Sequence, residues 1–183
     1  MYNWIDTSDY TSTTSGYYRE LFNLGDKLVC LYAGNIGKYQ ELDFLLELAK
    51  ENQDKSDLIF LIVGSGSEKE RLINKYSCLN NVVFTDFISP ESYPKLVREC
   101  DIGLINLNRD LTIQNVPGKM LGYWAAKIPV LASVNVGNDV AKIIEDSNGG
   151  LYSITGDFEE YNANFNRLYE DGILRKRNGE SGP

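Results

Sequence analysis

Short apolar runs recur along the chain and give its first structural prediction. Residues 28–33 and 58–63 are almost wholly apolar, and each run is followed at once by glycine. Runs of this length are typical of parallel strands that are buried on both faces of a sheet. Shorter runs continue the pattern, and the six strands predicted in this way are 28–33, 58–63, 82–84, 102–105, 129–132 and 151–153.

Between these runs, apolar residues recur at the three- and four-residue spacing of amphipathic helices. Leu42, Leu45, Leu46 and Ala49 are one such set. Ser89 followed by Pro90 is typical of an N-cap and a first helical residue. The helices predicted are about 39–50, 68–76, 90–100, 118–126, 139–146 and 158–169.

Alternating strands and helices predict the fold class: α/β, a Rossmann-like doubly wound parallel sheet of about six strands with helices on both faces. The 183 residues suit one domain, which we place at 27–174. Residues 1–26 include a hydroxyl-rich stretch and are interpreted as an interdomain linker or arm. Residues 175–183 lack an apolar face and are interpreted as a truncated tail.

Composition excludes several classes of protein. The chain has no histidine, so by itself it holds neither a Ser-His-Asp triad nor a histidine-ligated zinc site. Its net charge of −8 argues against general nucleic-acid binding. No signal peptide and no apolar run of about 18 residues is found. The three cysteines are interpreted as reduced core thiols of a cytoplasmic protein.

Candidate chemistry lies where the predicted strands end, because open parallel sheets bind ligands beyond the carboxyl ends of their strands. Glycine turns fall there at 34–37 and 64–66, and a polar loop leads into 117–119. Lys38 and Lys119 stand at predicted helix starts, where free N–H groups favour phosphate. Such glycines also occur in any α/β turn, and Lys38 alone is typical of a solvated surface. Neither the dinucleotide fingerprint nor a Walker lysine is present.

One longer stretch resembles a known family. Residues 117–133 resemble P-S-K-x-x-E-Y-x-A-A-G-K-P-V-L-A-S, which marks the C-terminal domain of retaining glycosyltransferases of the two-Rossmann-domain GT-B architecture, family 4. Residues 3–6, 32–37, 62–66 and 140–150 resemble further family segments in the same order. The resemblance is nearest to transferases of bacterial O-antigen and capsule synthesis.

The resemblance implies a nucleotide-sugar donor, usually a UDP-sugar, bound in a cleft between two domains. The turn at 34–37 and Lys38 would face the diphosphate with Lys119, and the segment after the third strand would lie along the base. Carried over by position, the implied donor-binding residues are Gly34, Asn35, Ile36, Gly37, Lys38, Gly64, Phe87, Ile88, Gln114, Asn115, Val116, Lys119, Leu121 and Gly122.

The resemblance further implies that neither a metal nor another cofactor is needed, and it identifies no catalytic residue. The family's paired glutamates fall at Gln114 and Gly122, and Gly122 has no side chain to hold a donor ribose. The family's N-terminal acceptor domain has no counterpart in the chain, so we expect a separate acceptor domain or subunit and little transfer by this chain alone. A full-length enzyme peripheral to the inner membrane is compatible with the resemblance.

Three alternatives remain open at this point. Gln114 and Gly122 favour a degenerate, non-catalytic nucleotide-binding or interaction module. A sugar-nucleotide epimerase shares the architecture, but such enzymes use residues of both domains, and this chain has no obvious carboxylate dyad. The third alternative is a Rossmann domain with an unrelated ligand.

Overall fold

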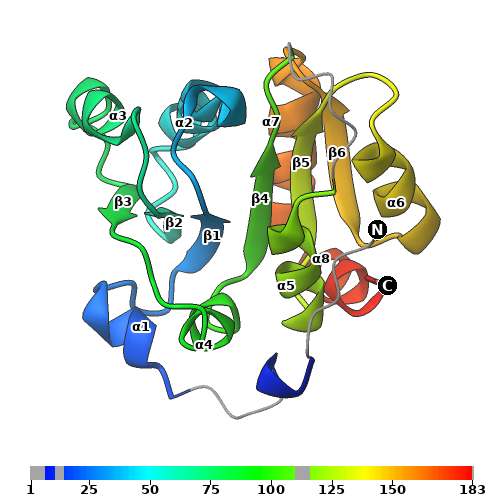
Figure 1. Ribbon diagram of the computed structural model, residues 1–183, viewed down its shortest axis with the longest axis horizontal. Helices are drawn as coiled ribbons and strands as arrows, with labels where there is room; N and C mark the ends of the chain where they lie inside the picture. The colour runs from blue at the N-terminus through cyan, green and yellow to red at the C-terminus, as the bar shows by residue number, and fades with distance from the viewer. Residues whose placement is uncertain (1–6, 11–14, 110–115, 183) are drawn as a thin grey trace.

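A six-stranded parallel sheet organises the chain, as the computed structural model describes it for residues 7–10, 15–109 and 116–182. Its order, β3-β2-β1-β4-β5-β6, reverses between β1 and β4 (Figure 1). This order is the doubly wound arrangement, so the predicted fold class is confirmed. The strands are β1 (Leu28–Ala33), β2 (Leu58–Val63), β3 (Val82–Thr85), β4 (Ile102–Asn106), β5 (Val130–Val134) and β6 (Gly150–Ile154).

Helices cover both faces of the sheet; Figure 1 shows α5 in front of β4 and β5 and α7 behind them. The α-helices are α1 (Tyr17–Leu21), α2 (Leu42–Glu51), α3 (Lys69–Lys75), α4 (Tyr93–Val97), α5 (Gly118–Ala125), α6 (Asp139–Ser147), α7 (Phe158–Glu170) and α8 (Gly172–Glu180). Two short 3-10 helices are η1 (Thr7–Tyr10) and η2 (Lys38–Gln40).

Strand β1 shows how the core is divided between the two faces. Its residues point alternately to opposite sides of the sheet. Val29, Leu31 and Ala33 join the cluster under α1, α4, α5 and α6. Cys30 and Tyr32 join the cluster packed with α2, α3, α7 and α8. Burial on both faces explains why this strand is a continuous apolar run.

Two predicted helices begin later than expected. The first is split, because Glu41 adopts left-handed φ of 45° between η2 and α2. The second begins at Tyr93 and not at Pro90. The Ser89 carbonyl accepts hydrogen bonds from the Ser92 and Tyr93 N–H groups, so residues 89–92 form a turn ahead of α4. Ser89 is therefore not the N-cap.

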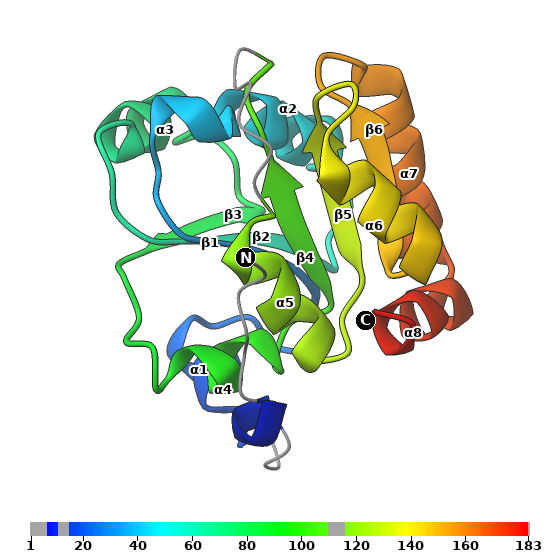
Figure 2. The ribbon, with the colours of Figure 1, turned by 45° about the vertical axis from the view of Figure 1, so that its right-hand side comes forward.

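Helices α1 and α8 were not predicted, and both contribute to the core. Tyr18 of α1 is buried, and the buried Glu99 carboxylate accepts hydrogen bonds from the Tyr18 and Arg19 N–H groups at 2.8 and 3.0 Å. In α8, Leu174 is buried, and the helix lies next to the end of α5 (Figure 2). The boundaries at 26/27 and 174/175 stay predictions, although residues up to Glu180 are helical.

The cysteines differ in their surroundings. All three are free thiols; Cys30 and Cys100 are buried, whereas Cys78 is exposed after α3. The interpretation as core thiols is therefore wrong for Cys78. Burial raises the pKa of both Cys30 and Cys100, which makes these two thiols poor nucleophiles.

Candidate functional site

The turns after β1 and β2 pack directly on one another at the carboxyl edge of the sheet. Gly34 N–H donates to the Val63 carbonyl at 2.9 Å, and Ile36 N–H donates to the Ser65 carbonyl at 2.8 Å. At Gly64, with φ of 146°, a Cβ atom would lie 1.9 Å from the Gly34 carbonyl oxygen. Gly64 therefore permits an approach of two backbones that no other residue allows. The Gly64 backbone thereby packs against the turn at 34–37.

Lys119, the second residue of α5, reaches the same turn. Its ammonium lies 3.7 Å from the centroid of the buried Tyr32 ring, and a Cβ atom on Gly34 would lie 3.3 Å from its Nζ. With the residues that the structure describes, Lys119 makes no hydrogen bond or ion pair. Desolvation lowers the pKa of Lys119 to about 7. Among the described residues, Lys119 therefore has an aromatic face beside it and no carboxylate paired with it.

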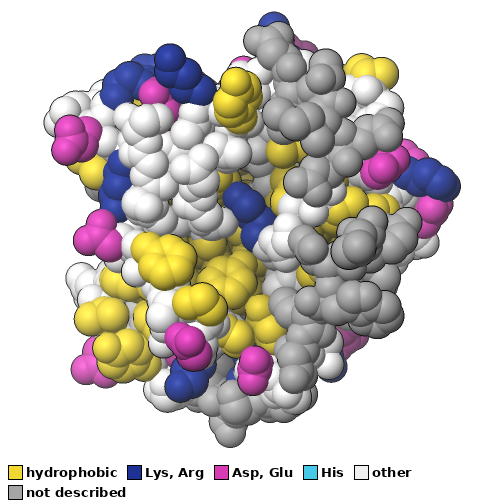
Figure 3. All heavy atoms as spheres, in the orientation of Figure 1, with side chains coloured by type: hydrophobic (Ala, Val, Ile, Leu, Met, Phe, Trp, Pro, Cys, Tyr) yellow, Lys and Arg dark blue, Asp and Glu magenta, His cyan; other side chains and the backbone are white. Residues whose placement is uncertain are grey.

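A cavity of about 410 Å³ opens above Lys119 and the Gly34 turn. Its walls are mostly apolar, and Figure 3 shows hydrophobic side chains gathered around a hollow on this face. It is lined by Ala33, Gly34 and Val63 at the ends of β1 and β2; Phe87, Ile88 and Pro90 after β3; Tyr93 and Pro94 of α4; Gly118 and Lys119 of α5; and Asp9 and Tyr10 of η1. An apolar chamber with a cation at one end suits a ligand with a flat apolar part and an anionic part.

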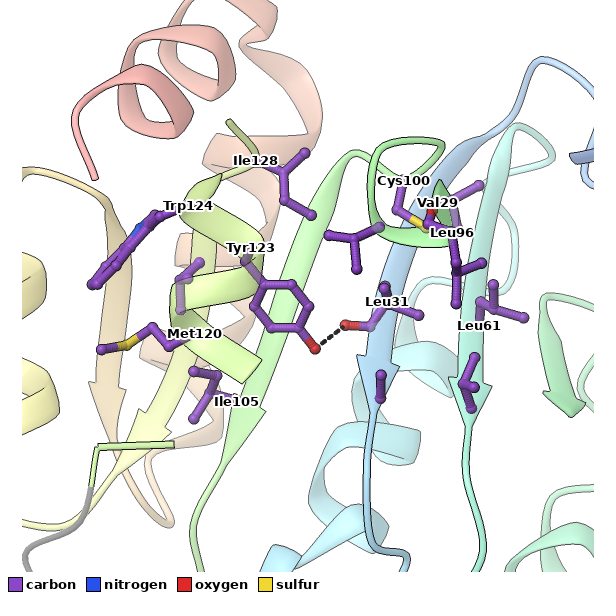
Figure 4. Close-up of a cluster of buried hydrophobic side chains, with 14 of the residues drawn as sticks. Val29, Leu31, Leu61, Leu96, Cys100, Ile105, Met120, Tyr123, Trp124 and Ile128 are labelled. Carbon is purple, nitrogen blue, oxygen red and sulfur yellow. Dashed lines mark hydrogen bonds between the residues drawn. The ribbon is translucent and has the colours of Figure 1, made fainter. Parts of the chain in front are cut away.

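Tyr123 marks the point where the strand order reverses. β1 and β4 pair at Cys30 with Ile102 and at Leu31 with Gly103. A Cβ atom on Gly103 would lie 2.2 Å from the Tyr123 ring, so the glycine makes room for the ring. The Tyr123 hydroxyl donates to the Leu31 carbonyl at 3.1 Å (Figure 4). The site therefore lies at a topological switch point, where doubly wound sheets bind ligands.

Gly122, one of the two positions of the paired glutamates, is buried beneath two tyrosines. A Cβ atom there would lie 3.0 Å from the Tyr10 hydroxyl and 3.0 Å from the Tyr93 ring. Any longer side chain would have to displace one of these rings. The volume that a glutamate would occupy is thus filled by Tyr10 and Tyr93 in this chain.

The structure brings four of the predicted residues together in the cavity wall, namely Gly34, Phe87, Ile88 and Lys119. Ile36 is the fully buried residue of the turn at 34–37, and Gly64 packs against Gly34 of the same turn.

The other predicted residues lie elsewhere. Asn35, Gly37 and the exposed Lys38 do not line the cavity. Val116 packs against the core, and Leu121 faces a second cavity of about 610 Å³ between α5 and α8. Gln114 and Asn115 lie outside the described residues.

Sequence reasoning missed the tyrosine and acidic residues of the cavity wall. Tyr10 and Asp9 fall in the segment interpreted as an arm, and the helical spacing predicts for Tyr93 only a place on the apolar face of its helix. Nothing in the hydroxyl-rich stretch around Tyr10 indicates that this residue lines a cavity. For Tyr93, its closeness to the turn after β3 was a usable signal.

Neither a metal cluster nor a membrane span is found in the described ranges. No group of three or more His, Cys, Asp or Glu side chains converges within residues 7–10, 15–109 and 116–182. Within the same ranges, none of the helices has the length and apolar character needed to cross a bilayer.

The doubly wound sheet with a cavity at its switch point matches one Rossmann-like half of the GT-B fold seen in solved glycosyltransferase structures. The family described as "Glycosyl transferases group 1" matches residues 18–183, and the chain belongs to this family.

Curated relatives are longer than this chain. A putative colanic acid biosynthesis glycosyl transferase, WcaI of Escherichia coli K12, is 30% identical over 129 residues, which cover 67% of this chain and 31% of the relative. Alpha-D-kanosaminyltransferase of Streptomyces kanamyceticus is 27% identical, covering 89% of this chain and 42% of the relative. The chain thus spans less than half the length of these relatives.

Solved structures show the same fold. HepE of Anabaena, in complex with UDP-glucose, superposes with a TM-score of 0.81 at 16% identity, covering 98% of this chain and 50% of HepE. The C-terminal domain of LpcC, a group 1 family protein of Francisella tularensis, superposes with a TM-score of 0.76 at 17% identity, covering 98% and 94%. At these identities the likeness concerns the fold alone.

Proposed function

We propose that this chain is the donor-binding half of a glycosyltransferase that takes a nucleotide sugar, specifically a UDP-sugar. The observation that carries the proposal is the cavity in which Lys119 and the Gly34 turn meet the apolar wall of Phe87 and Ile88. A nucleoside diphosphate has matching parts, an anionic diphosphate and a flat base. The presence of UDP-glucose in the HepE complex supports UDP as the nucleotide.

The same groups account for how the chain would assist transfer. Departure of the nucleoside diphosphate builds negative charge on the β-phosphate. The Lys119 ammonium, together with backbone N–H groups at the start of α5, stabilises that charge without needing a metal ion. Among the described residues no carboxylate pairs with Lys119, so none of them competes with a diphosphate for its ammonium.

One relative supports a proposal for the pathway. The name of WcaI refers to colanic acid biosynthesis, which supports a role in bacterial surface polysaccharide synthesis. The transferred sugar would be a hexose or an N-acetylhexosamine, and the acceptor a glycan or lipid-linked sugar. The acceptor would bind an N-terminal domain or separate subunit, so this chain alone would bind donor weakly and transfer little or no sugar. We place the enzyme in the cytoplasm.

Calorimetric titration tests the proposal. UDP, GDP, ADP and UDP-N-acetylglucosamine are titrated into the chain with and without Mg²⁺. We expect metal-independent binding of the UDP compounds that Lys119→Ala weakens. Lys142→Ala serves as control, because Lys142 is exposed on α6 and pairs with Asp146. Absence of binding by every nucleotide, or equal binding by Lys119→Ala, would contradict the proposal.

A second candidate is a non-catalytic nucleotide-binding module. The burial of Gly122 beneath Tyr10 and Tyr93 favours it, because the position of a family glutamate holds no carboxylate. The two candidates differ in turnover. A chain joined to its acceptor half should release UDP from UDP-sugar in the presence of acceptor if it is an enzyme, whereas a binding module should bind UDP with no release.

A further inference from the structure

Lys69, the first residue of α3, makes three polar contacts at the edge of the candidate site. Its ammonium donates to the Gly64 carbonyl at 2.9 Å and to the Thr85 carbonyl at 2.8 Å. It also pairs with the Asp86 carboxylate at 2.7 Å. The Lys69 side chain is only 16% exposed. All three donor positions of the ammonium are therefore used within the protein.

These acceptors do not line the cavity themselves, but each is close in the chain to a residue that does. Thr85 is the last residue of β3 and comes two residues before Phe87. Gly64 follows β2 and lies against the Gly34 turn. Lys69 itself does not line the cavity, so it has no direct contact to offer a ligand there. Its contacts instead fix the point at which residues 86–88 leave the sheet, relative to the turn that holds Gly34.

We propose that Lys69 is a positioning residue for the donor site, which sets the place of Phe87 and Ile88 against the Gly34 turn. The inference rests on the proposed function, because the site that Lys69 would position is the proposed donor site. A site residue held on a loop needs such support, because small displacements of a binding wall weaken binding.

The contacts to the two carbonyls carry this role more than the ion pair does. Asp86 is 98% exposed, and exposed ion pairs contribute little. The Gly64 and Thr85 carbonyls lie at the ends of the buried β2 and the half-buried β3, and hydrogen bonds from a charged donor to such carbonyls are strong. We therefore expect Asp86→Asn to have a much smaller effect than Lys69→Met.

Hydrogen exchange tests the positioning role without any ligand. Lys69→Met keeps the length of the side chain and removes its donors, whereas Lys69→Arg keeps a cation and several donors. Lys75→Met is the matched control, because Lys75 lies at the other end of α3 and pairs with Asp43 at 2.6 Å. We expect faster exchange in Lys69→Met alone at the Gly64 amide, whose N–H donates to the Thr85 carbonyl at 3.2 Å where residues 86–88 leave the sheet. Unchanged exchange there, or equal acceleration in Lys75→Met, would overturn the inference.

Titration with UDP then links the role to the site. We expect Lys69→Met to weaken UDP binding by about tenfold, Lys69→Arg to recover most of the loss, and Lys75→Met to bind like the unaltered chain. Equal UDP affinity in Lys69→Met and the unaltered chain would overturn the inference and leave the proposed function standing. Absence of UDP binding by the unaltered chain would overturn the proposed function, while the exchange experiment still decides whether Lys69 positions residues 86–88.

Discussion

The starts of α3 and α5 lie at the same edge of the sheet, and each carries a lysine with opposite surroundings. Lys69 on α3 is held by two carbonyls and a carboxylate. Lys119 on α5 lies over the Tyr32 ring and makes no hydrogen bond or ion pair with the described residues. A lysine whose donors are used inside the protein builds the site, and one whose donors are unused is available to a ligand. Residue type and position at a helix start are the same in both cases.

The largest expected effect comes from disrupting the contact between Gly64, which accepts a hydrogen bond from Lys69, and the Gly34 turn, which Lys119 reaches. Gly64→Ala would place a Cβ atom 1.9 Å from the Gly34 carbonyl oxygen at a φ of 146°. We expect a loss of about 3 kcal/mol in the free energy of unfolding, measured by urea denaturation. Gly137→Ala is the control, because Gly137 also has positive φ but open space around it, and should cost about 1 kcal/mol. Equal losses would show that the contact between the turns contributes nothing.

The next effect isolates the lysine on α5. Lys119→Met should weaken UDP binding by on the order of 30-fold, because the cation facing the diphosphate is lost. Uridine, which has no phosphate, should bind with nearly unchanged affinity. Calorimetry with both ligands measures the difference. Parallel losses for UDP and uridine would mean that Lys119 shapes the cavity without contacting the phosphates.

The third effect concerns pH. Burial lowers the pKa of Lys119 to about 7 in the free chain, and a bound diphosphate would raise it again. Binding should therefore take up a proton above pH 7, and affinity should fall by about tenfold between pH 7 and pH 8 to 8.5. UDP-glucose is the suitable ligand, since its diphosphate does not titrate in this range. Titrations in buffers of different ionisation enthalpy measure the uptake, and Lys119→Met should abolish it.

The smallest expected effect is on stability, and it concerns Asp43 of α2 and its partners Arg71 and Lys75 on α3. Hydrogen bonds from Arg71 and Lys75 lower the pKa of Asp43 to about 2, against the opposing effect of partial burial. A lowered carboxyl pKa stabilises the fold above the unfolded value, and the benefit disappears as pH falls from about 4 to about 2. Because the side chains are well exposed, Asp43→Asn should cost less than about 1 kcal/mol at pH 7. Urea denaturation at pH 7 and pH 2.5 should show this difference shrinking.

The sequence predicted the strands well, because burial on both faces leaves continuous apolar runs such as 28–33. It also led to Gly34 and Lys119, since parallel topology brings strand ends and helix starts to one edge. It could not predict α1, whose N–H groups are capped by Glu99 about 80 residues away. Nor could it place Tyr10 over Gly122, because that contact depends on tertiary packing between distant segments.

The limited pairing between β1 and β4 affects how the domain would partially unfold. β1 and β2 are in register over six residue pairs, whereas β1 and β4 share two, supplemented by the Tyr123 hydroxyl. Backbone pairing is therefore weakest where the strand order reverses. Partial unfolding should divide the sheet along this line into a β1–β3 unit and a β4–β6 unit. Since α5 belongs to one unit and the Gly34 turn to the other, the same separation would take the two sides of the cavity apart.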